Sequence, residues 1–449
     1  MYINRVQLID IRQFDKLDLS FTAESGKALK WSLFLGDNAT GKTTLLRSIA
    51  VGLCDESSAA GLVRELTGSL VRKGSSKRGI IRIELVDSNG TAWTLETTLE
   101  PLRRTGDRVR QKAFRCGIDA ITTRKQKGKK NRARQIDISD FPWQGLFVVG
   151  YGAGRQAQGS EEYESYRNVD AVYTLFRYDQ DLQSPELCWR RLVDAARKKA
   201  RVKKEVAADR EDERIRKLLH QVLDLGDRED LELTPTSIQV NGLGYSTPLS
   251  SHADGYKATT TWVLDMIAWR MLFSSGLVPD SMTGIVLIDE IEQHLHPKWQ
   301  RYIISRLHQQ FPKLQFIATT HSPLCTAGTG DLTTDECQLI SLSRTRGTVD
   351  KEILSLPRGL RADQILTSEA FELEDTRNPE IGEKVALFRQ LSQKTRLTAT
   401  ERTRLARLRR FINDRVPEAA QFEEEREVRD SLRNLIKEIK NSRSGLDAK

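Results

Sequence analysis

The amino-acid sequence predicts an α/β protein with a mixed, mainly parallel sheet. Three apolar runs have the composition of buried strands, at 31–36 ("WSLFLG"), 283–290 ("TGIVLIDE") and 314–323 ("LQFIATTHSP"). Helical patterns follow the first two. "KTTLLRSIAVGL" begins at Lys42, and "PKWQRYIISRLHQQF" begins at Pro297, a residue favoured in the first turn of a helix. Strands that alternate with helices favour a mainly parallel sheet covered by helices.

A β-rich lobe and one more buried strand are predicted beside this core. The first residues, "MYINRVQLIDIRQF", alternate between apolar and polar side chains, which predicts a first strand. "IIRIELVD" and "TAWTLETTLE" flank a turn at Ser88-Asn89-Gly90, which predicts a β-hairpin. "GLFVVGYGAG" at 145–154 predicts a buried strand that runs into glycines.

The remaining predicted elements are mostly helical. Residues 184–225 have a helical and highly charged pattern, and "LELTPTSIQVNGLG" after them returns to a strand pattern. The segment 255–273, "GYKATTTWVLDMIAWRMLF", predicts a strong helix in which Val263, Ile267 and Met271 share one face.

The chain divides into a head and a tail. We assign residues 1–365 to the head, with the hairpin and a basic loop at 64–140 and a short helical insert at 184–245. Residues 366–449 are predicted to form a small helical appendage for partner docking or oligomerisation. In this appendage "TATE" at 398–401 matches the pattern of a helix cap.

Positive charge is concentrated in two runs. The formal net charge of the chain is +9, and the runs are "RKQKGKKNRAR" at 124–134 and "RKKARVKK" at 197–204. They are either a solvated loop and a charged helix face, or a patch for the phosphate backbone of DNA. Aromatic residues do not interleave with them, so base stacking on these runs is not indicated.

Composition excludes several classes of protein. No run of about 18 apolar residues is present, so we expect no transmembrane helix. The N-terminus lacks the apolar block and cleavage site of a signal peptide. Five scattered cysteines without a CxxC pair predict neither a disulfide framework nor a zinc knuckle, so a cytoplasmic location is expected.

The segment Gly36–Thr43, "GDNATGKT", matches the phosphate-binding pattern G-x-x-x-x-G-K-[ST] between a strand and a helix. Such a turn aims backbone N–H groups at phosphate oxygens, and the helix N-terminus adds positive potential. We expect Lys42 to contact the β- and γ-phosphates of ATP and Thr43 to bind Mg²⁺. The predicted ATP-binding residues are Gly36, Asp37, Asn38, Ala39, Thr40, Gly41, Lys42, Thr43 and Thr44.

Carboxylates end the strand at 283–290. An ATPase of this kind needs an aspartate at a strand end to hold Mg²⁺, and Asp289 supplies it. Glu290 follows and is placed to orient or deprotonate the attacking water. His321 ends the strand at 314–323, where it is predicted to sense or stabilise the γ-phosphate. We therefore predict Glu290 and His321 as catalytic residues, Thr43 and Asp289 as metal-binding residues, and ATP and Mg²⁺ as cofactors.

The stretch "IDEIEQHLHPKWQ" raises a second hypothesis. His294 and His296 have HxH spacing and could belong to a metal centre of a nuclease, although further ligands would be needed. Pro297 begins a helix directly afterwards, which places His296 near the N-cap of that helix. From these residues alone, both a metal centre and the acidic half of an ATPase site are open.

Four motifs in order resemble the ABC-type ATPase head shared by SMC and RecF proteins: "GDNATGKT", "GIVLIDE", "EQHLHP" and "TTHSP". The resemblance covers about 1–365 and implies a P-loop ATPase head with a β-rich lobe, a short helical insert and a helical C-terminal appendage. It also implies that Asp289 is the Walker B aspartate, Glu290 the catalytic glutamate and His321 the switch histidine. "EQHLHP" would then be the D-loop, which faces the other subunit of a dimer.

Heads of this class form dimers in which a signature loop from one subunit covers the nucleotide of the other. The segment 249–260, "LSSHADGYKATT", matches this loop in position, and Asp254, Gly255 and Tyr256 would act in trans. Ala253 stands where the family pattern has serine, which departs from that pattern. Alternatively, Asp254 is simply an N-cap.

"YGAGR" resembles a YGxxR segment in compact, defence-associated ATPases, among them those of the Septu and PARIS systems and the ATPase half of the overcoming-lysogenization-defect nucleases. The resemblance implies that Arg155 lies near the dimer interface or the nucleotide, and Gln156 is a candidate Q-loop residue. The helical tail lacks a DxD pair, so no built-in TOPRIM nuclease is expected.

Two function classes follow. The first is a slow ATPase that dimerises with nucleotide and regulates a partner effector nuclease in anti-phage defence, with an HNH nuclease favoured and a TOPRIM nuclease second. The second is a RecF- or SMC-like DNA-binding clamp for repair, which would use the basic runs at 124–134 and 197–204. A transporter ATPase is disfavoured, because the N-terminal pattern and the inserts do not suit one.

Overall fold

The computed structural model divides the chain into two compact units, Met1–Glu372 and Leu373–Lys449, and each is described separately below. The residues that it describes are 1–66, 68–73, 78–101, 114–125, 134–155, 168–178, 182–203, 207–234, 236–252, 254–273, 282–345, 347–373, 375–394 and 397–415.

The β-rich lobe of the first unit is a six-stranded antiparallel sheet in the order β2-β1-β4-β5-β6-β7. Its strands are β1 (Tyr2–Ile11), β2 (Phe14–Ser20), β4 (Gly79–Val86), β5 (Thr91–Pro101), β6 (Phe114–Lys125) and β7 (Arg134–Ile136). The predicted first strand and the β4–β5 hairpin are both confirmed. Buried residues alternate with partly exposed ones along β4, so one face of the sheet packs on a core.

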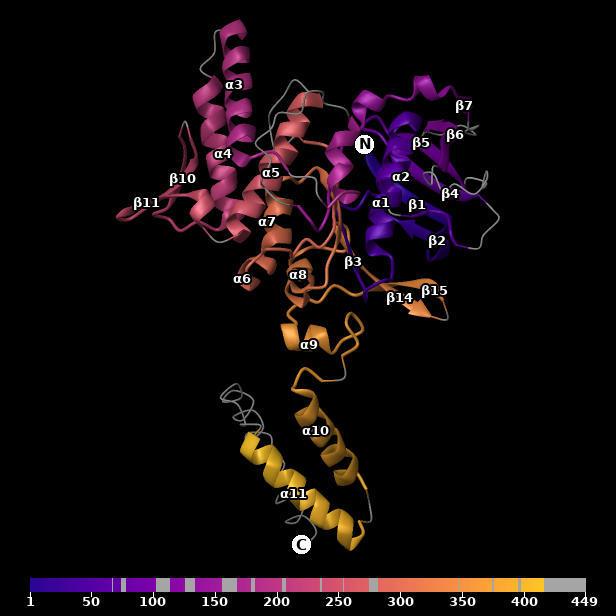
Figure 1. The fold of residues 1–449 in the computed structure, drawn as a ribbon, viewed down its shortest axis with the longest axis vertical. Coiled ribbons are helices and arrows are strands. Elements are labelled where there is room, and N and C mark those ends of the chain that lie inside the picture. Colours follow the sequence, from indigo (N-terminus) through magenta and orange to yellow (C-terminus); the bar gives the residue numbers. More distant parts are fainter. Residues whose placement is uncertain are drawn as a thin grey trace, which may run out of the picture. The chain divides into compact units, whose positions relative to one another are not determined.

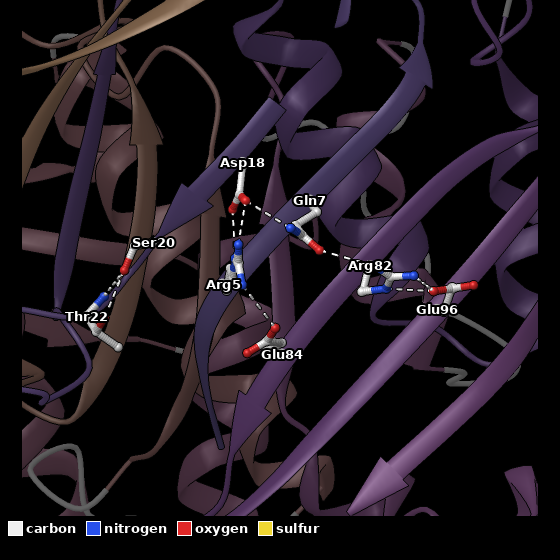
Figure 2. A network of polar contacts seen from close by, with 8 residues as sticks. All are labelled: Arg5, Gln7, Asp18, Ser20, Thr22, Arg82, Glu84 and Glu96. Carbon is white, nitrogen blue, oxygen red and sulfur yellow. Dashed lines mark hydrogen bonds and ion pairs between the residues drawn. The ribbon is translucent and has the colours of Figure 1, made fainter. Parts of the chain in front are cut away.

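The other face of this sheet carries a polar network (Figure 2). Nε of Arg5 donates to Oδ1 of Asp18 at 2.8 Å, and Nε2 of Gln7 donates to Oδ2 at 2.9 Å. On the neighbouring strands Nε of Arg82 donates to Glu96 at 2.6 Å. The bond from Arg5 lowers the pKa of Asp18 to about 2. Cations and carboxylates alternate across the strands, so they pair with each other and contribute modestly to sheet stability.

A second six-stranded sheet has the order β15-β14-β3-β13-β12-β8 and is parallel except for the β14–β15 pair. Its strands are β3 (Trp31–Leu35), β8 (Val148–Tyr151), β12 (Gly284–Ile288), β13 (Leu314–Thr319), β14 (Cys337–Thr345) and β15 (Thr348–Leu354). The predicted fold class, an α/β fold with a mixed, mainly parallel sheet and a β-rich lobe, is therefore confirmed.

Helices cover both faces of this second sheet (Figure 1). The described helices of this unit are α1 (Lys42–Gly52), α2 (Glu56–Glu65), α3 (Pro185–Lys203), α4 (Ala207–Leu223), α5 (Asp254–Phe273), α6 (Pro297–Gln300), α7 (Ile303–Gln310), α8 (Pro323–Gly328) and α9 (Ala362–Leu366), of which α9 packs on α8. Alternate residues of β12 show the layering. Ile285 and Leu287 share a core with α1 and the antiparallel sheet, whereas Val286 and Ile288 share the other core with α3, α4, α5 and α7.

Helix α1 is held tightly between the two sheets. A Cβ atom added at Gly52 would lie 2.7 Å from Cδ1 of Ile83 on β4 and 2.8 Å from Cγ2 of Ile81. The helix that follows the phosphate-binding loop is therefore fixed by packing on both sides.

The predicted insert at 184–245 contains the antiparallel pair α3 and α4, followed by a small sheet in the order β11-β10-β9. The small strands are β9 (Asp230–Leu233), β10 (Ile238–Gly242) and β11 (Tyr245–Pro248). The helical and strand patterns predicted here are both confirmed.

Three predictions differ from the structure. The single helix expected from Pro297 is broken into α6 and α7 by a turn at Arg301–Tyr302. The prediction of one apolar face on α5 is incomplete, because every residue from 259 to 269 is buried, and the side chain of Met271 lies outside the described residues. The run at 124–134, predicted as a loop, begins in β6 and ends in β7, and its middle lies outside the described residues.

In the second unit, α10 (Pro379–Ser392) and α11 (Ala399–Arg415) form a helical hairpin (Figure 1). The predicted cap of α11 is confirmed, since Glu401 N–H donates to Oγ1 of Thr398 at 3.2 Å and Thr398 N–H donates to Oε2 of Glu401 at 2.9 Å. Nζ of Lys384 lies 3.8 Å from the ring centroid of Phe411, which joins the two helices.

A buried carboxylate lies inside α5. Asp265 is 2% exposed and accepts a hydrogen bond of 2.9 Å from the hydroxyl of Tyr151 on β8. Burial raises the pKa of Asp265 to about 7, and the bond from Tyr151 opposes that rise only in part. An aspartate in an unfolded chain ionises near pH 4. Between these two values the folded state holds one more proton than the unfolded state, so stability falls as pH rises through this window.

We predict that Asp265→Asn flattens this pH dependence. The parent should lose about 2 to 3 kcal/mol of unfolding free energy between pH 5 and pH 8 through Asp265 alone, and the variant should not lose it. Urea unfolding of both proteins at the two pH values measures the difference. The exposed Asp335→Asn is the control and should keep the parent's pH dependence. An unchanged pH dependence in Asp265→Asn would contradict the prediction.

Candidate functional site

The phosphate-binding loop predicted from the sequence connects β3 to α1. Its backbone has positive φ angles of 140° at Gly36, 66° at Ala39 and 102° at Gly41. A side chain at Gly36 would clash with the carbonyl oxygen of Leu342, and one at Gly41 would clash with Gln13. Glycine is therefore required at both ends of the turn, since it tolerates positive φ and close backbone approach.

The N-terminus of α1 is suited to an anion. Gly41 provides no side-chain cap, and the first turn contains no acidic residue. The first N–H groups of the helix therefore need partners from outside the helix. Lys42 is 6% exposed, and its Nζ donates to the carbonyl oxygens of Gly36 at 2.7 Å and Asp37 at 3.0 Å. Burial lowers the pKa of Lys42, while Asp289 and Glu290 raise it. The ammonium thus lies over the loop, as binding of phosphates requires.

Asp289 lies where three segments meet, and it is 3% exposed. Its Oδ2 accepts a hydrogen bond of 2.6 Å from Oγ1 of Thr43, and its Oδ1 accepts one of 2.7 Å from Oγ1 of Thr319. The structure therefore brings together the two residues predicted to bind metal. A hydroxyl and a carboxylate are hard oxygen donors of the kind that Mg²⁺ prefers, so the pair fits this ion.

Glu290 is the second residue after β12 and has a positive φ of 49°. Its N–H donates to Oγ1 of Thr319 at 2.8 Å, which fixes the backbone at this strained position. The side chain is half-buried, and its carboxylate has no hydrogen-bond partner within the described parts of the chain. It is therefore available to a ligand or a water molecule.

The predicted site residues lie at one edge of the parallel sheet. β3, β13 and β12 are neighbours and run parallel, so their carboxyl ends lie side by side. The loop at Gly36–Thr43 follows β3, His321 follows β13, and Asp289 and Glu290 follow β12. His321 is exposed. Ligands of open α/β sheets bind at such an edge.

Arg155 is buried behind this edge and acts on the backbone. Nη1 donates to the carbonyl oxygens of Asp289 at 2.7 Å and Gly152 at 3.1 Å, and Nη2 donates to that of Glu290 at 2.9 Å. Arg155 is 3% exposed, and its burial lowers its pKa to about 10. Sequence analysis placed Arg155 near the dimer interface or the nucleotide, but missed that it holds the backbone where β12 ends. The available signal was an arginine four residues after the tyrosine that ends a neighbouring strand.

The predicted signature segment contacts the predicted D-loop of the same chain. A Cβ atom at Gly255 would lie 2.6 Å from the carbonyl oxygen of His294, so this close approach requires glycine. The ring of Tyr256 meets Trp299 edge-on, with centroids 4.1 Å apart. Helix α5 begins at Asp254, and the side chain of Asp254 lies outside the described residues, so its alternative role as an N-cap stays a prediction. The contact of these residues with a second subunit stays a prediction.

The metal-centre hypothesis for the two histidines has no support in the described residues. The described residues contain no group of three or more His, Cys, Asp or Glu side chains that could hold a metal ion. Nδ1 of His296 accepts a hydrogen bond of 3.2 Å from Lys298 N–H and caps α6, as predicted. Two residues singled out in the sequence, Gln156 and Ala253, lie outside the described residues.

Two family models match the chain. One, described as "AAA domain", matches residues 5–234, which is more than half of the 449 residues. The chain belongs to this AAA-domain family. A second, described as "AAA domain, putative AbiEii toxin, Type IV TA system", matches residues 263–326, which contain Asp289, Glu290 and His321. The head therefore carries an ATPase domain.

Known relatives match the chain in part. The Septu protein PtuA of Bacillus mycoides (strain KBAB4) is 24% identical over 388 residues, which is 84% of this chain but only 45% of that relative. The Retron Ec83 probable ATPase of Escherichia coli is 40% identical over 94 residues, 21% of this chain and 17% of the relative. The Retron Vc95 probable ATPase of Vibrio cholerae serotype O1 biovar El Tor is 50% identical over 73 residues, 16% of this chain and 14% of the relative. The chain thus spans less than half the length of each of these relatives.

Solved structures give a looser likeness. The crystal structure of "the SmcHead bound to the C-winged helix domain of ScpA" has a TM-score of 0.49 and 16% identity, covering 79% of this chain and 99% of that one. The SMC head domain from Thermotoga maritima has a TM-score of 0.42 and 13% identity, covering 79% and 100%. The assignment of the fold rests on the strand order and the site geometry above.

Proposed function

We propose that this protein binds ATP with Mg²⁺ and hydrolyses it slowly. The observation that carries the proposal is the arrangement of Lys42, Thr43, Asp289 and Glu290 at one sheet edge, with Thr43 hydrogen-bonded to Asp289 at 2.6 Å. These residues come from two segments 246 positions apart in the chain. Membership of the AAA-domain family supports the same conclusion.

Each residue has a chemical role in this proposal. Lys42 and the N–H groups at the start of α1 bind the phosphates, and the burial of Lys42 strengthens this electrostatic attraction. Thr43 and Asp289 hold Mg²⁺, which neutralises charge on the phosphates when it is bound. Glu290 orients or deprotonates the attacking water, and His321 contacts the γ-phosphate.

We propose that nucleotide drives dimerisation. Asp254, Gly255 and Tyr256 would contact the nucleotide of a second subunit, and the segment "EQHLHP" would face that subunit. The close packing of Gly255 on His294 supports a shared surface, because the signature segment and the D-loop cannot move independently. A homodimer or a higher homo-oligomer follows from this arrangement.

The proposed biological role is control of an effector nuclease in anti-phage defence. The names of the relatives, a Septu protein and two retron ATPases, support this class of role. The resemblance to Septu ATPases favours an HNH nuclease as the partner, with a TOPRIM nuclease second. We propose the helical region around α10 and α11 as its docking element and the cytoplasm as its location. None of the helices in the described part of the chain has the length and apolar run that a membrane crossing requires.

The DNA-clamp alternative has less support. The middle of the basic run at 124–134 lies outside the described residues. In the run at 197–204, Arg197 pairs with Asp194 of the same helix at 3.5 Å. On the polar face of the antiparallel sheet, Arg5 pairs with Asp18, and Arg82 pairs with Glu96 (Figure 2). A clamp needs unbalanced positive charge for phosphate contacts.

For catalysis we predict opposite defects in two variants. Lys42→Ala should bind ATP at least about tenfold more weakly, because a buried phosphate ligand is lost. Glu290→Gln should keep ATP affinity, reduce turnover by about a hundredfold or more, and accumulate as an ATP-bound dimer. Nucleotide titration, phosphate release and size-exclusion chromatography with light scattering measure these three properties. Turnover at the parent rate in Glu290→Gln would show that another group activates the water.

For the partner, we predict that affinity purification from a host carrying the native gene neighbourhood recovers a nuclease. A variant of the protein truncated after residue 372 should no longer recover the nuclease, because the second unit is the proposed docking element. Recovery of DNA in a salt-sensitive complex, without a nuclease, would favour the clamp instead.

A further inference from the structure

Glu292 lies two residues after Glu290 and accepts two short hydrogen bonds. Its Oε2 accepts from Oγ1 of Thr320 at 2.6 Å, and its Oε1 accepts from the N–H of His321 at 2.6 Å. Hydrogen bonds to an ionised carboxylate are shorter and about twice as strong as those between neutral groups. The site as described above gives this carboxylate no role.

These bonds join two loops at the edge of the sheet. Glu292 belongs to the segment after β12, whereas Thr320 and His321 follow β13. One residue earlier in each loop, the backbone N–H of Ile291 donates to the carbonyl oxygen of Thr319 at 3.0 Å. The carboxylate continues this pairing after the strands have ended. It fixes the backbone of His321, while the imidazole of His321 remains exposed.

The network extends from Glu292 into the next helix. Thr320 is fully buried, and its hydroxyl accepts a bond of 3.0 Å from Ser322 N–H while it donates to Glu292. Oγ of Ser322 caps α8 and donates to Gln300 at 2.6 Å. A shift of Glu292 would therefore disturb both His321 and the start of α8.

On its other side, Glu292 is connected to the signature segment. It lies two residues before His294, whose carbonyl oxygen packs on Gly255 at the start of α5. Glu292 is itself the first residue of the D-loop segment "EQHLHP", so this segment contacts the loop that carries His321 through Glu292 and contacts α5 through His294.

We infer that Glu292 is a positioning residue that holds His321 for catalysis and transmits the position of the D-loop to it. This inference rests on the proposed ATP hydrolysis at the same site. A carboxylate suits the task because both groups facing it are donors. Glutamine would place an NH₂ group against one donor, and aspartate is one methylene shorter.

The test compares Glu292→Gln, Thr320→Val, His321→Ala and the double variant Glu292→Gln/His321→Ala with the parent. We expect Glu292→Gln to lower turnover about tenfold with ATP affinity within about twofold, since one charge-assisted bond is lost but no phosphate ligand. Thr320→Val should have a similar effect. The double variant should be no slower than His321→Ala alone, because residues that act as a unit are not additive.

Hydrogen exchange gives a readout that does not depend on ATP. The amide of His321 should exchange about tenfold faster in Glu292→Gln, because it loses its carboxylate acceptor. Glu336→Gln is the matched control. Glu336 also accepts from a backbone N–H and a hydroxyl, both of Thr333, at 3.0 and 2.7 Å. Glu336 adjoins Cys337, which pairs with Trp31 at the end of β3 far from the phosphate-binding loop. Glu336→Gln should therefore keep the parent's turnover.

Three results would overturn the inference: parent turnover in Glu292→Gln, a further tenfold loss in the double variant, or unchanged exchange at His321. If Glu292→Gln does not fold, Thr320→Val decides by the same criteria. A parent that shows no ATP turnover would refute the proposed function, and the exchange of the His321 amide would then decide whether Glu292 holds this loop.

Discussion

The site depends on the two hydrogen bonds that Asp289 accepts from Thr43 and Thr319. A buried carboxylate is unfavourable unless hydroxyl or N–H groups satisfy it. Here the two hydroxyls come from the start of α1, which follows β3, and from the end of β13. The hydrogen bonds to the Asp289 carboxylate therefore hold the ends of β3, β12 and β13 together. Arg155 supports the same point from behind through the carbonyl oxygens of Asp289 and Glu290. The chain thus fixes the positions of its oxygen donors by packing and hydrogen bonds within one subunit.

Burial of α5 limits how this site can respond to nucleotide. Residues 259–269 of the helix are buried on all sides, because the parallel sheet covers one side and α3 and α4 of the insert cover another. Such a helix cannot shift alone without opening the core. Changes in nucleotide state are therefore expected to act through the loops at the strand ends, or to move α5 and the insert together.

Much of the fold followed from short-range patterns. The strands β3, β12 and β13 are uniformly buried, and their apolar runs identify them without any partner. The phosphate-binding loop and Asp289 were predictable for the same reason, since glycine at positive φ and a carboxylate at a strand end are local requirements. A phosphate-binding loop needs an aspartate at a strand end to hold Mg²⁺, and this requirement predicted that Asp289 lies near Thr43.

The contributions that sequence analysis missed come from long-range contacts. The bonds from Arg155 to Asp289 span 134 positions, and those from Glu292 to the loop after β13 span 28 or 29. The local sequence does not show which backbone groups or hydroxyls these side chains contact. The all-round burial of α5 was missed for a related reason, because a repeat of i, i+4 identifies one apolar face but not a second layer of helices. The break between α6 and α7 has no local signal such as proline or glycine.

The central claim is that Thr43 and Asp289 hold Mg²⁺ beside the phosphates, and ATP affinity in Thr43→Val tests it most directly. Calorimetric titration of parent and variant is carried out once with EDTA and once with Mg²⁺. With EDTA the two affinities should agree within about twofold, because Lys42 and the backbone N–H groups of the loop are unchanged. With Mg²⁺ the parent should bind ATP more tightly, and Thr43→Val should not, since it lacks the hydroxyl ligand. An equal gain from Mg²⁺ in both proteins would contradict the claim.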